Sequence, residues 1–317
     1  RGRITVQHNC LLLRRVDATP GAAGLSGTPT AAAPTAAGAT RPPPRTVVIE
    51  TGTGDKLDDK SRDLFAMERR SIIDALRDAG TAPESVDAVV VSHLHFDHAG
   101  GLTRVCREGE TPDWTGPAGG MAGSRPDHGV KRTFPSARVY VQRREWLDAL
   151  ANRSVMTRTY FRDHLEPLEG QLTLVDSPAP FTPGVTPDRE AAPLGSVRLR
   201  RTEIEPGAGV WVFQTPGHTW GQQAVMFIDD QGRTVVFTPD VLPTAAHLGA
   251  AFSLAYDVEP YTSMLTKRWF LEEAAAGGWL LVLDHEAGNP VRRVKPDGKG
   301  WFTLEPLDAS SNGVTGS

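Results

Sequence analysis

The chain has little of what several protein classes require. Two cysteines, Cys10 and Cys106, occur among its 317 residues, which excludes a disulfide framework and a cysteine-based zinc knuckle. Both are expected to be buried or half-buried apolar thiols. Apolar runs such as Trp279–Leu283 are far shorter than the about 20 residues that a membrane helix needs. The net charge of −4 leaves no basic excess for a nucleic-acid backbone. We therefore expect no membrane and no nucleic-acid partner.

The N-terminus offers no targeting signal. The first residue is Arg1 rather than methionine, and no signal peptide precedes it. We therefore expect a trimmed or processed chain that has lost any targeting segment. The cytoplasm is then the expected compartment, and secretion stays open.

Glycine and proline, with 32 and 25 residues, gather in three stretches, 17–45, 107–130 and 176–209. The first of these has too little apolar surface to offset the entropy of ordering it. The remaining residues, about 230, have ordinary globular composition and fit one domain. We expect a single domain over 1–317 with a truncated N-terminus. The three stretches are expected to be insertions that border or cover the functional site.

Hydrophobic patterns predict strands and helices that interleave along the chain. The four-residue spacing of Leu64, Glu68, Ile72 and Leu76 predicts one helix over 60–79 that ends at Gly80. Further helices are predicted over 142–151 and 262–276. Apolar runs predict strands at 4–16, 47–49, 86–92, 137–141, 172–175, 210–214, 223–228, 234–237 and 280–283, with 197–201 as a further candidate. A turn is predicted at 229–232. The order indicates an α/β or α+β class.

The most informative segment, SHLHFDHAGG, follows the predicted strand at 86–92. It places His93, His95, Asp97 and His98 within six residues, in a chain with nine histidines. Histidine and aspartate are ligands of zinc and similar divalent ions. On an extended segment the first two histidines project to the same side, and a turn can bring the other two residues to a second ion. A solvated polar loop is the competing interpretation, and the density of histidines disfavours it.

Three more candidate ligands, His218, Asp240 and His285, each follow an apolar, strand-like run. A single histidine at a strand end is more often a capping or hydrogen-bonded residue than a ligand. Three such residues together with the dense segment favour a metal site.

This order of ligands resembles the metallo-β-lactamase superfamily, from Ile4 to about Glu286. The resemblance implies an α/β (α+β) fold, an αββα sandwich of two mixed β-sheets flanked by helices. It implies two divalent ions, expected to be zinc, with iron, cobalt or manganese as other candidates. The implied ligands are His93, His95 and His218 for one ion and Asp97, His98 and His285 for the other, with Asp240 as the bridge.

Within the superfamily, the chain is most similar to quorum-quenching N-acyl homoserine lactonases and their methyl-parathion-hydrolase-like relatives. Asp240 stands where common zinc β-lactamases have cysteine, which favours the dinuclear hydrolase branch. Glu50 stands where the family usually has aspartate. We expect it to support the histidine ligands, and Asp284 and Asp55 are further candidates for this role. One lactonase subgroup has a tyrosine at the position of Pro243.

The resemblance implies a hydrolase acting on a small-molecule lactone or ester. A metal-bridging hydroxide would be the nucleophile, and Asp97 would transfer the proton. An organophosphate triester, an aryl ester or a thioester remains open as substrate, as does a metal-stabilised binding protein without turnover. Tyr256 or His247 could polarise the carbonyl, or could merely pack a helix start and cap a loop. A homodimer is a further expectation. An acyl pocket could be lined by Phe96, Trp220 and Phe252, although such residues are more often part of the core.

Overall fold

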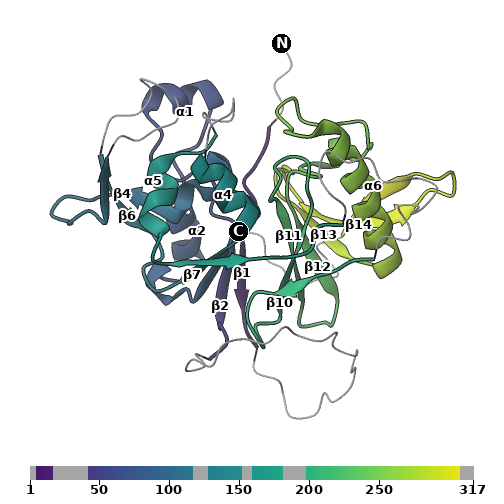
Figure 1. The fold of residues 1–317 in the computed structure, drawn as a ribbon, viewed down its shortest axis with the longest axis horizontal. Coiled ribbons are helices and arrows are strands. Elements are labelled where there is room, and N and C mark those ends of the chain that lie inside the picture. The colour runs from purple at the N-terminus through teal and green to yellow at the C-terminus, as the bar shows by residue number, and fades with distance from the viewer. Residues whose placement is uncertain (1–4, 17–41, 117–127, 152–158, 181–197, 308–317) are drawn as a thin grey trace.

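Two mixed sheets form the centre of the computed structural model, which describes residues 5–16, 42–116, 128–151, 159–180 and 198–307 (Figure 1). The first sheet has the order β1-β2-β3-β7-β8; β1 and β2 are antiparallel and the other neighbours parallel. Its strands are β1 (Leu11–Arg14), β2 (Thr46–Ile49), β3 (Ala88–Val90), β7 (Arg138–Gln142) and β8 (Leu172–Val175).

The second sheet has the order β15-β14-β13-β12-β11-β10-β9. Here β12 and β13 are parallel and the other neighbours antiparallel. Its strands are β9 (Thr202–Glu203), β10 (Val210–Gln214), β11 (Gln223–Ile228), β12 (Thr234–Thr238), β13 (Leu280–Leu283), β14 (Val291–Pro296) and β15 (Phe302–Pro306).

Helices cover the outer face of each sheet (Figure 1). The first sheet carries α2 (Ile72–Asp78), α4 (Arg143–Ala151) and α5 (Arg162–Leu165), and the second carries α6 (Pro260–Gly277), while α1 (Asp59–Phe65) lies above the helices of the first sheet. The one-turn helix α3 (Phe96–Ala99) follows β3. The predicted αββα sandwich of two mixed sheets is therefore confirmed.

The alternation of side chains along a strand builds the three apolar layers of this sandwich. Val48 of β2 packs with Ile72 of α2, on the outer face. Its neighbours Val47 and Ile49 lie in the layer between the sheets, with Phe237 of β12. A third layer joins the outer face of the second sheet to α6. Because successive side chains of a strand point to opposite faces, a strand buried on both sides is apolar throughout.

The single helix predicted over 60–79 is wrong, since α1 and α2 are separate helices. Ala66 ends α1 in the left-handed conformation, with φ of 53°. The Ser71 backbone N–H and hydroxyl both donate to Asp74, which starts a new helix. Leu64 is 73% exposed, whereas Leu76 is buried. The four-residue spacing had joined two helices that present different faces to the core.

The strands predicted at 4–16 and 86–92 are shorter in the structure, as β1 and β3. Gln7 and Asn9 leave the first sheet, and their backbone N–H groups donate to His285 and Asp284 in the other half. Residues 198–201 form no strand, and the pairing lies one step later, in β9. Most other predicted elements are confirmed within two residues, including the turn at 229–232, where the Gly232 N–H donates to the Asp229 carbonyl.

The stretch 107–130 is not wholly the loop that its composition predicted. It contains β5 (Trp114–Gly116) and the start of β6 (His128–Arg132), which pair with each other and with β4 (Thr103–Val105) in a three-stranded sheet. Val130 of the central strand pairs with Trp114 on one side and Val105 on the other, so apolar residues meet at one position of this otherwise polar sheet. Of the predicted insertions at 17–45, 107–130 and 176–209, the segments 17–41, 117–127 and 181–197 lie outside the described residues.

Cys10 and Cys106 are free and half-buried, as predicted. In the described ranges, no helix combines the length and apolar character needed to cross a membrane.

Candidate metal centre

The predicted ligands gather at one edge of the sandwich because their strands end there. The His93–His98 segment follows β3, and His218 lies in the turn between β10 and β11. Asp240 follows β12 and His285 follows β13. These last two strands are parallel neighbours, so their carboxyl ends meet at the same edge.

A tightly packed turn presents the second pair of ligands. His95 precedes α3, whose single turn carries Asp97 and His98. Behind it, a side chain at Gly100 would have its first carbon 2.1 Å from the Thr53 carbonyl oxygen, so only glycine fits. The buried Lys56 ammonium donates to the carbonyls of Gly100 and Thr103 and fixes the end of this segment.

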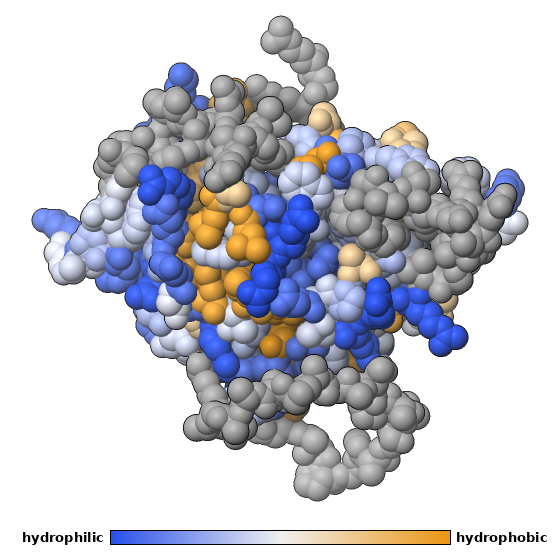
Figure 2. Space-filling view, in the orientation of Figure 1, coloured by the Kyte–Doolittle hydropathy of each residue, from blue (hydrophilic) through white to orange (hydrophobic). Residues whose placement is uncertain are grey.

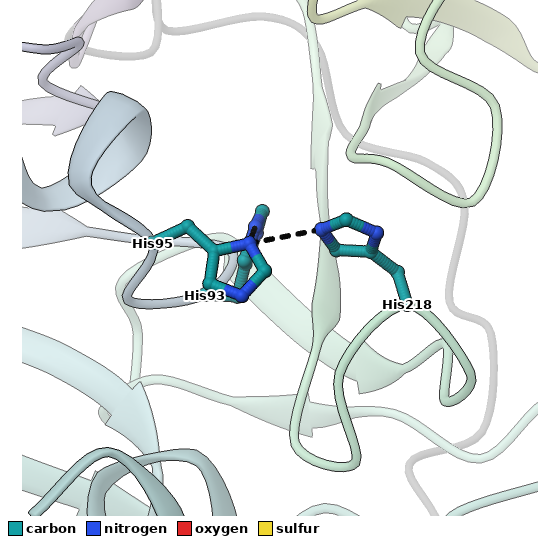
Figure 3. Close-up of side chains that lie close together, drawn as sticks. All are labelled: His93, His95 and His218. Carbon is teal, nitrogen blue, oxygen red and sulfur yellow. Dashed lines mark hydrogen bonds between the residues drawn. The ribbon is translucent and has the colours of Figure 1, made fainter. Parts of the chain in front are cut away.

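Three histidines converge in the first cluster (Figure 3). His95 Nδ1 lies 3.1 Å from His93 Nε2 and 3.0 Å from His218 Nε2. Nitrogen ligands of a tetrahedral zinc ion stand about 3.3 Å apart. His95 Nε2, on the far side of its ring, is buried without a hydrogen-bond partner in the described part of the chain. The three nitrogens therefore suit a divalent metal ion.

The second cluster contains His98, Asp240, Asp284 and His285, whose ligand atoms all lie within 4.8 Å of one another. Asp97, the expected third ligand here, stands beside it, with Oδ2 3.7 Å from His98 Nε2 and 3.8 Å from His285 Nε2. Besides the bridging Asp240, this cluster therefore has two nearby carboxylates, Asp97 and Asp284. The resemblance implied only Asp97 as a ligand here.

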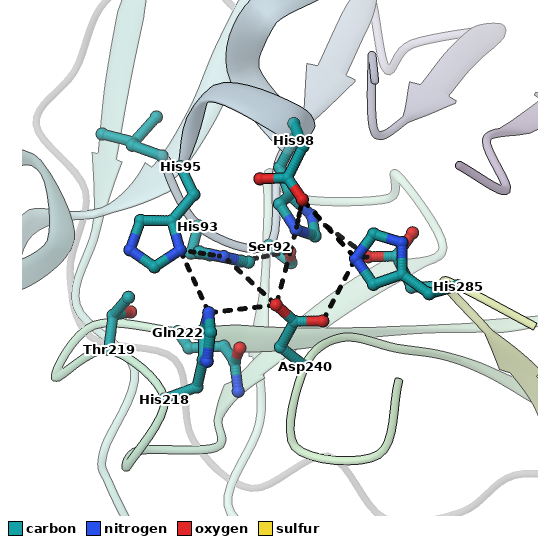
Figure 4. Close-up of polar contacts among 12 residues, drawn as sticks. Ser92, His93, His95, His98, His218, Thr219, Gln222, Asp240 and His285 are labelled. Carbon is teal, nitrogen blue, oxygen red and sulfur yellow. Dashed lines mark hydrogen bonds and ion pairs between the residues drawn. The ribbon is translucent and has the colours of Figure 1, made fainter. Parts of the chain in front are cut away.

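Asp240 lies between the two clusters (Figure 4). Its Oδ2 is 3.0 Å from His218 Nε2, and its Oδ1 is 3.2 Å from His285 Nε2. Its carboxylate is buried, with 2% of the side chain exposed. One residue therefore faces both groups of histidines, as a bridging ligand must.

Burial keeps two of the histidines neutral. It lowers the pKa of His93 well below its ordinary value and that of His95 to about 3. Neutral imidazole is the form that binds a metal ion. These two residues are therefore ready to bind a metal at pH 7 without losing a proton.

The opposite shift occurs where carboxylates are close. Burial alone would lower the pKa of His218 and His285, but Asp240 and Asp257 together outweigh it at His218, as do Asp284 and Asp240 at His285. The resulting pKa values are about 9 and about 10. Burial would raise the pKa of Asp240, yet the two histidines hold it well below its usual range. A divalent ion would replace the protons in this buried cluster.

Most ligand histidines are oriented through their other ring nitrogen. His98 Nδ1 lies 3.1 Å from Asp284 Oδ2 and 3.3 Å from Glu50 Oε2. Both acids therefore take the supporting position predicted for them. Asp55 does not, because it accepts instead from the Val105 N–H. Partners of this kind orient metal-binding histidines and strengthen their binding.

Several residues that the sequence did not assign complete the site. Asp257 Oδ1 lies 2.8 Å from His218 Nδ1, and the Gln7 carbonyl accepts from His285 Nδ1 at 2.8 Å. His8 stands edge-on to His285, with ring centroids 5.2 Å apart, and a third group of possible ligands comprises these two histidines and Asp97. Histidine is scarce in this chain, so His8 was the one that its sequence could have flagged.

The candidate substrate-binding residues differ in their distance from the metal centre and in their contacts. Tyr256 is 57% exposed and its ring lies 5.6 Å from that of His218, beside the metal centre. His247 caps a loop through Thr244, with 2.8 Å between Nδ1 and Oγ1. Phe96 packs with Phe161 at 5.6 Å. The other two candidates lie toward the surface, Trp220 beneath Arg144 and Phe252 at 60% exposure.

Comparison with known proteins agrees with this geometry. The model of the metallo-beta-lactamase superfamily matches residues 43–285. A probable metal-dependent hydrolase from Staphylococcus aureus is 22% identical, with a TM-score of 0.58 over 83% of this chain and 79% of that one. AidC, a dizinc quorum-quenching lactonase solved with its product N-hexanoyl-L-homoserine, is 15% identical, with a TM-score of 0.57 over 83% and 76%. The hydrolase AbOPH is 18% identical, with a TM-score of 0.55 over the same shares.

The family match covers well over half of the chain, so the protein belongs to the metallo-β-lactamase superfamily. It is a hydrolase of that superfamily, whose members generally bind divalent metal ions. The likeness to the solved structures shows a shared fold at these identities. No curated protein matches the chain in sequence.

Proposed function

We propose that this protein is a dinuclear, zinc-dependent hydrolase that opens the ring of a lactone of the N-acyl homoserine type. The position of Asp240, between His218 and His285, carries the proposal. A shared carboxylate supports two ions a few ångströms apart, an arrangement suited to ester hydrolysis. The proposed ligands are His93, His95 and His218 for one ion and Asp97, His98 and His285 for the other, with Asp240 shared.

When bound, two divalent ions would supply an activated water at neutral pH and polarise the carbonyl of the substrate. The chain's own residues then handle the proton. Asp97 lies at the rim of the site, with 26% of its side chain exposed. We assign it the transfer of the proton from the attacking water to the leaving alkoxide.

Residues beside the site suit a substrate with an apolar part. Partial burial, with the carboxylates of Asp240 and Asp97, raises the pKa of Tyr256, so its hydroxyl stays a hydrogen-bond donor. That donor can stabilise the negative charge that develops on the carbonyl oxygen. Phe65 is 45% exposed and lies 6.0 Å from the ring of Phe96, next to the ligands. These rings offer a wall for an acyl chain. The dizinc lactonase AidC, with its acyl homoserine product, supports this substrate class.

A second candidate is the same site acting on an organophosphate triester, an aryl ester or a thioester. Pro243 favours this second candidate. It stands where one lactonase subgroup has a tyrosine, and proline has no hydroxyl to donate to a carbonyl. Tyr256 must then supply that donor if the substrate is a lactone.

A substrate panel decides between these. The zinc-loaded protein is assayed against N-hexanoyl and N-decanoyl homoserine lactone, paraoxon, an aryl ester and a thioester. We expect kcat/KM for the lactones to exceed that for the other substrates at least about tenfold, and Asp240→Asn to lose at least about a hundredfold. Faster turnover of another class would overturn the lactone assignment.

A further inference from the structure

One buried carboxylate connects the two loops that carry the three-histidine cluster. Glu145, in the first turn of α4, is fully buried. Its Oε1 accepts from the Leu94 backbone N–H at 3.0 Å, and its Oε2 accepts from the Thr219 hydroxyl at 2.6 Å. Leu94 stands between the first two histidines of the cluster, and Thr219 directly follows the third. A single side chain therefore links both ligand-bearing loops.

Two further contacts hold this link in place. The Tyr160 hydroxyl donates to Glu145 Oε1 at 3.1 Å, and its ring lies 5.1 Å from that of His95. The turn that contains Gly221 approaches α4 so closely that a side-chain carbon there would lie 2.2 Å from the Glu145 backbone nitrogen. Helix α4 follows β7 of the first sheet, whereas the turn that contains Gly221 joins β10 and β11 of the second sheet. These contacts therefore connect the two halves of the sandwich.

We propose that Glu145 is a positioning residue that sets the separation of His218 from His93 and His95, and thereby the metal affinity of that cluster. The inference rests on the proposed metal site, although Glu145 lies among the supporting contacts and is not one of the proposed ligands. The second cluster has its own supports, Glu50 and Asp284. Loss of the Glu145 contacts should therefore weaken the binding of one ion and spare the other.

The test uses Thr219→Val, which removes one hydroxyl without changing the size of the side chain. Its matched control is Thr133→Val, because Thr133 is also buried and its hydroxyl has no hydrogen-bond partner among the described residues. The metal-free full chains are titrated with Co²⁺ and with Zn²⁺ against a competing chelator, and the visible absorption of cobalt is recorded.

We expect Thr219→Val to bind one of its two ions about tenfold more weakly and to change the cobalt spectrum of that ion. Thr219→Ser should restore both, and Thr133→Val should match the wild type. Glu145→Gln, which keeps an oxygen for Leu94, should fall between the wild type and Glu145→Leu. Wild-type affinities and spectra in Thr219→Val and Glu145→Gln would overturn the inference, even if their melting temperatures fall.

This titration separates the inference from the proposed function. It needs no substrate, so a wild-type protein that turns over no lactone but loses affinity for one ion in Thr219→Val would contradict the proposed substrate and support the inference. A protein that opens lactones but binds both ions equally well in Thr219→Val and in the wild type would support the proposed substrate and contradict the inference about Glu145.

Discussion

Asp257 holds His218 in place through a 2.8 Å hydrogen bond to Nδ1, so that Nε2 faces the metal centre. Removing such a partner typically costs about 10- to 100-fold in metal affinity. We expect Asp257→Ala to lose about that much for one ion, and Asp257→Asn, which keeps an acceptor oxygen, to lose less. Competition with a chelator measures both.

The control for this substitution is Asp176→Ala, because Asp176 pairs with Arg143 on the surface and is 66% exposed. It should bind zinc like the wild type. Equal affinities for Asp257→Ala and the wild type would mean that the hydrogen bond to His218 does not support a metal ligand.

Metal uptake should release protons at neutral pH. Three buried ligand histidines have raised pKa values, about 9 at His218, about 10 at His285 and well above the ordinary value at His98, so all three are protonated at pH 7 in the metal-free protein. A metal ion binds the neutral form and displaces these protons, so affinity rises with pH up to this range and levels off above it. Calorimetry in buffers of different ionisation enthalpy should show release of about three protons at pH 7 and fewer at pH 9.5.

His285→Ala offers the internal check, because it removes one of the three titrating histidines. Its proton release at pH 7 should fall by about one. An affinity that does not change between pH 6 and pH 9 would contradict the ion pairing in the second cluster.

Gly100 is required by the packing behind the metal ligands. Its alanine variant places a carbon 2.1 Å from the Thr53 carbonyl oxygen, which forces backbone to move and should cost about 3 kcal/mol or more of unfolding free energy. Gly170→Ala is the control, since nothing lies within 4 Å of the added carbon. Urea denaturation compares them, and equal stability of the two variants would refute the close approach.

Tyr256 provides a test of substrate contact that leaves the ligands intact. Tyr256→Phe keeps the ring beside His218 and removes the hydroxyl, so kcat/KM for the lactone should fall about 10- to 100-fold. Zinc content should not change. Tyr261→Phe, in α6, is the surface control. Unchanged kinetics in Tyr256→Phe would contradict a role for this hydroxyl in stabilising the carbonyl oxygen.

The residues predicted as ligands could be found because each follows an apolar strand, and such strands bring their ends to one edge. The segment around His93 and His95 indicated both the ligand types and their relative placement. No local sequence pattern indicated the residues that support the ligands. The Gln7 carbonyl and His285 are 278 positions apart, and Glu145 sits in an ordinary amphipathic helix. Their roles depend on how the two halves pack, which residue spacing does not encode.

The fold was predictable where apolar runs were short and isolated, as at β10, β11 and β13. The fold was harder to predict where a polar residue interrupts a regular apolar spacing. Ser71 does this, because it starts α2 within the stretch that the spacing predicted as one helix. Figure 2 shows a related limit. Apolar side chains gather on the surface near α4, where Leu147 and Leu150 are about half exposed, so an apolar residue at helical spacing did not guarantee burial.

The most direct test of a catalytic dinuclear zinc site is metal content measured together with lactone hydrolysis in the wild type and in His93→Ala. We predict about two zinc ions in the wild type and about one in the variant. Ring opening should be lost in the variant, and should return in the metal-stripped wild type when zinc is added back. Ring opening that survives in the metal-stripped wild type, or a wild-type protein that binds two zinc ions and hydrolyses no substrate of the panel, would contradict a catalytic dinuclear zinc site.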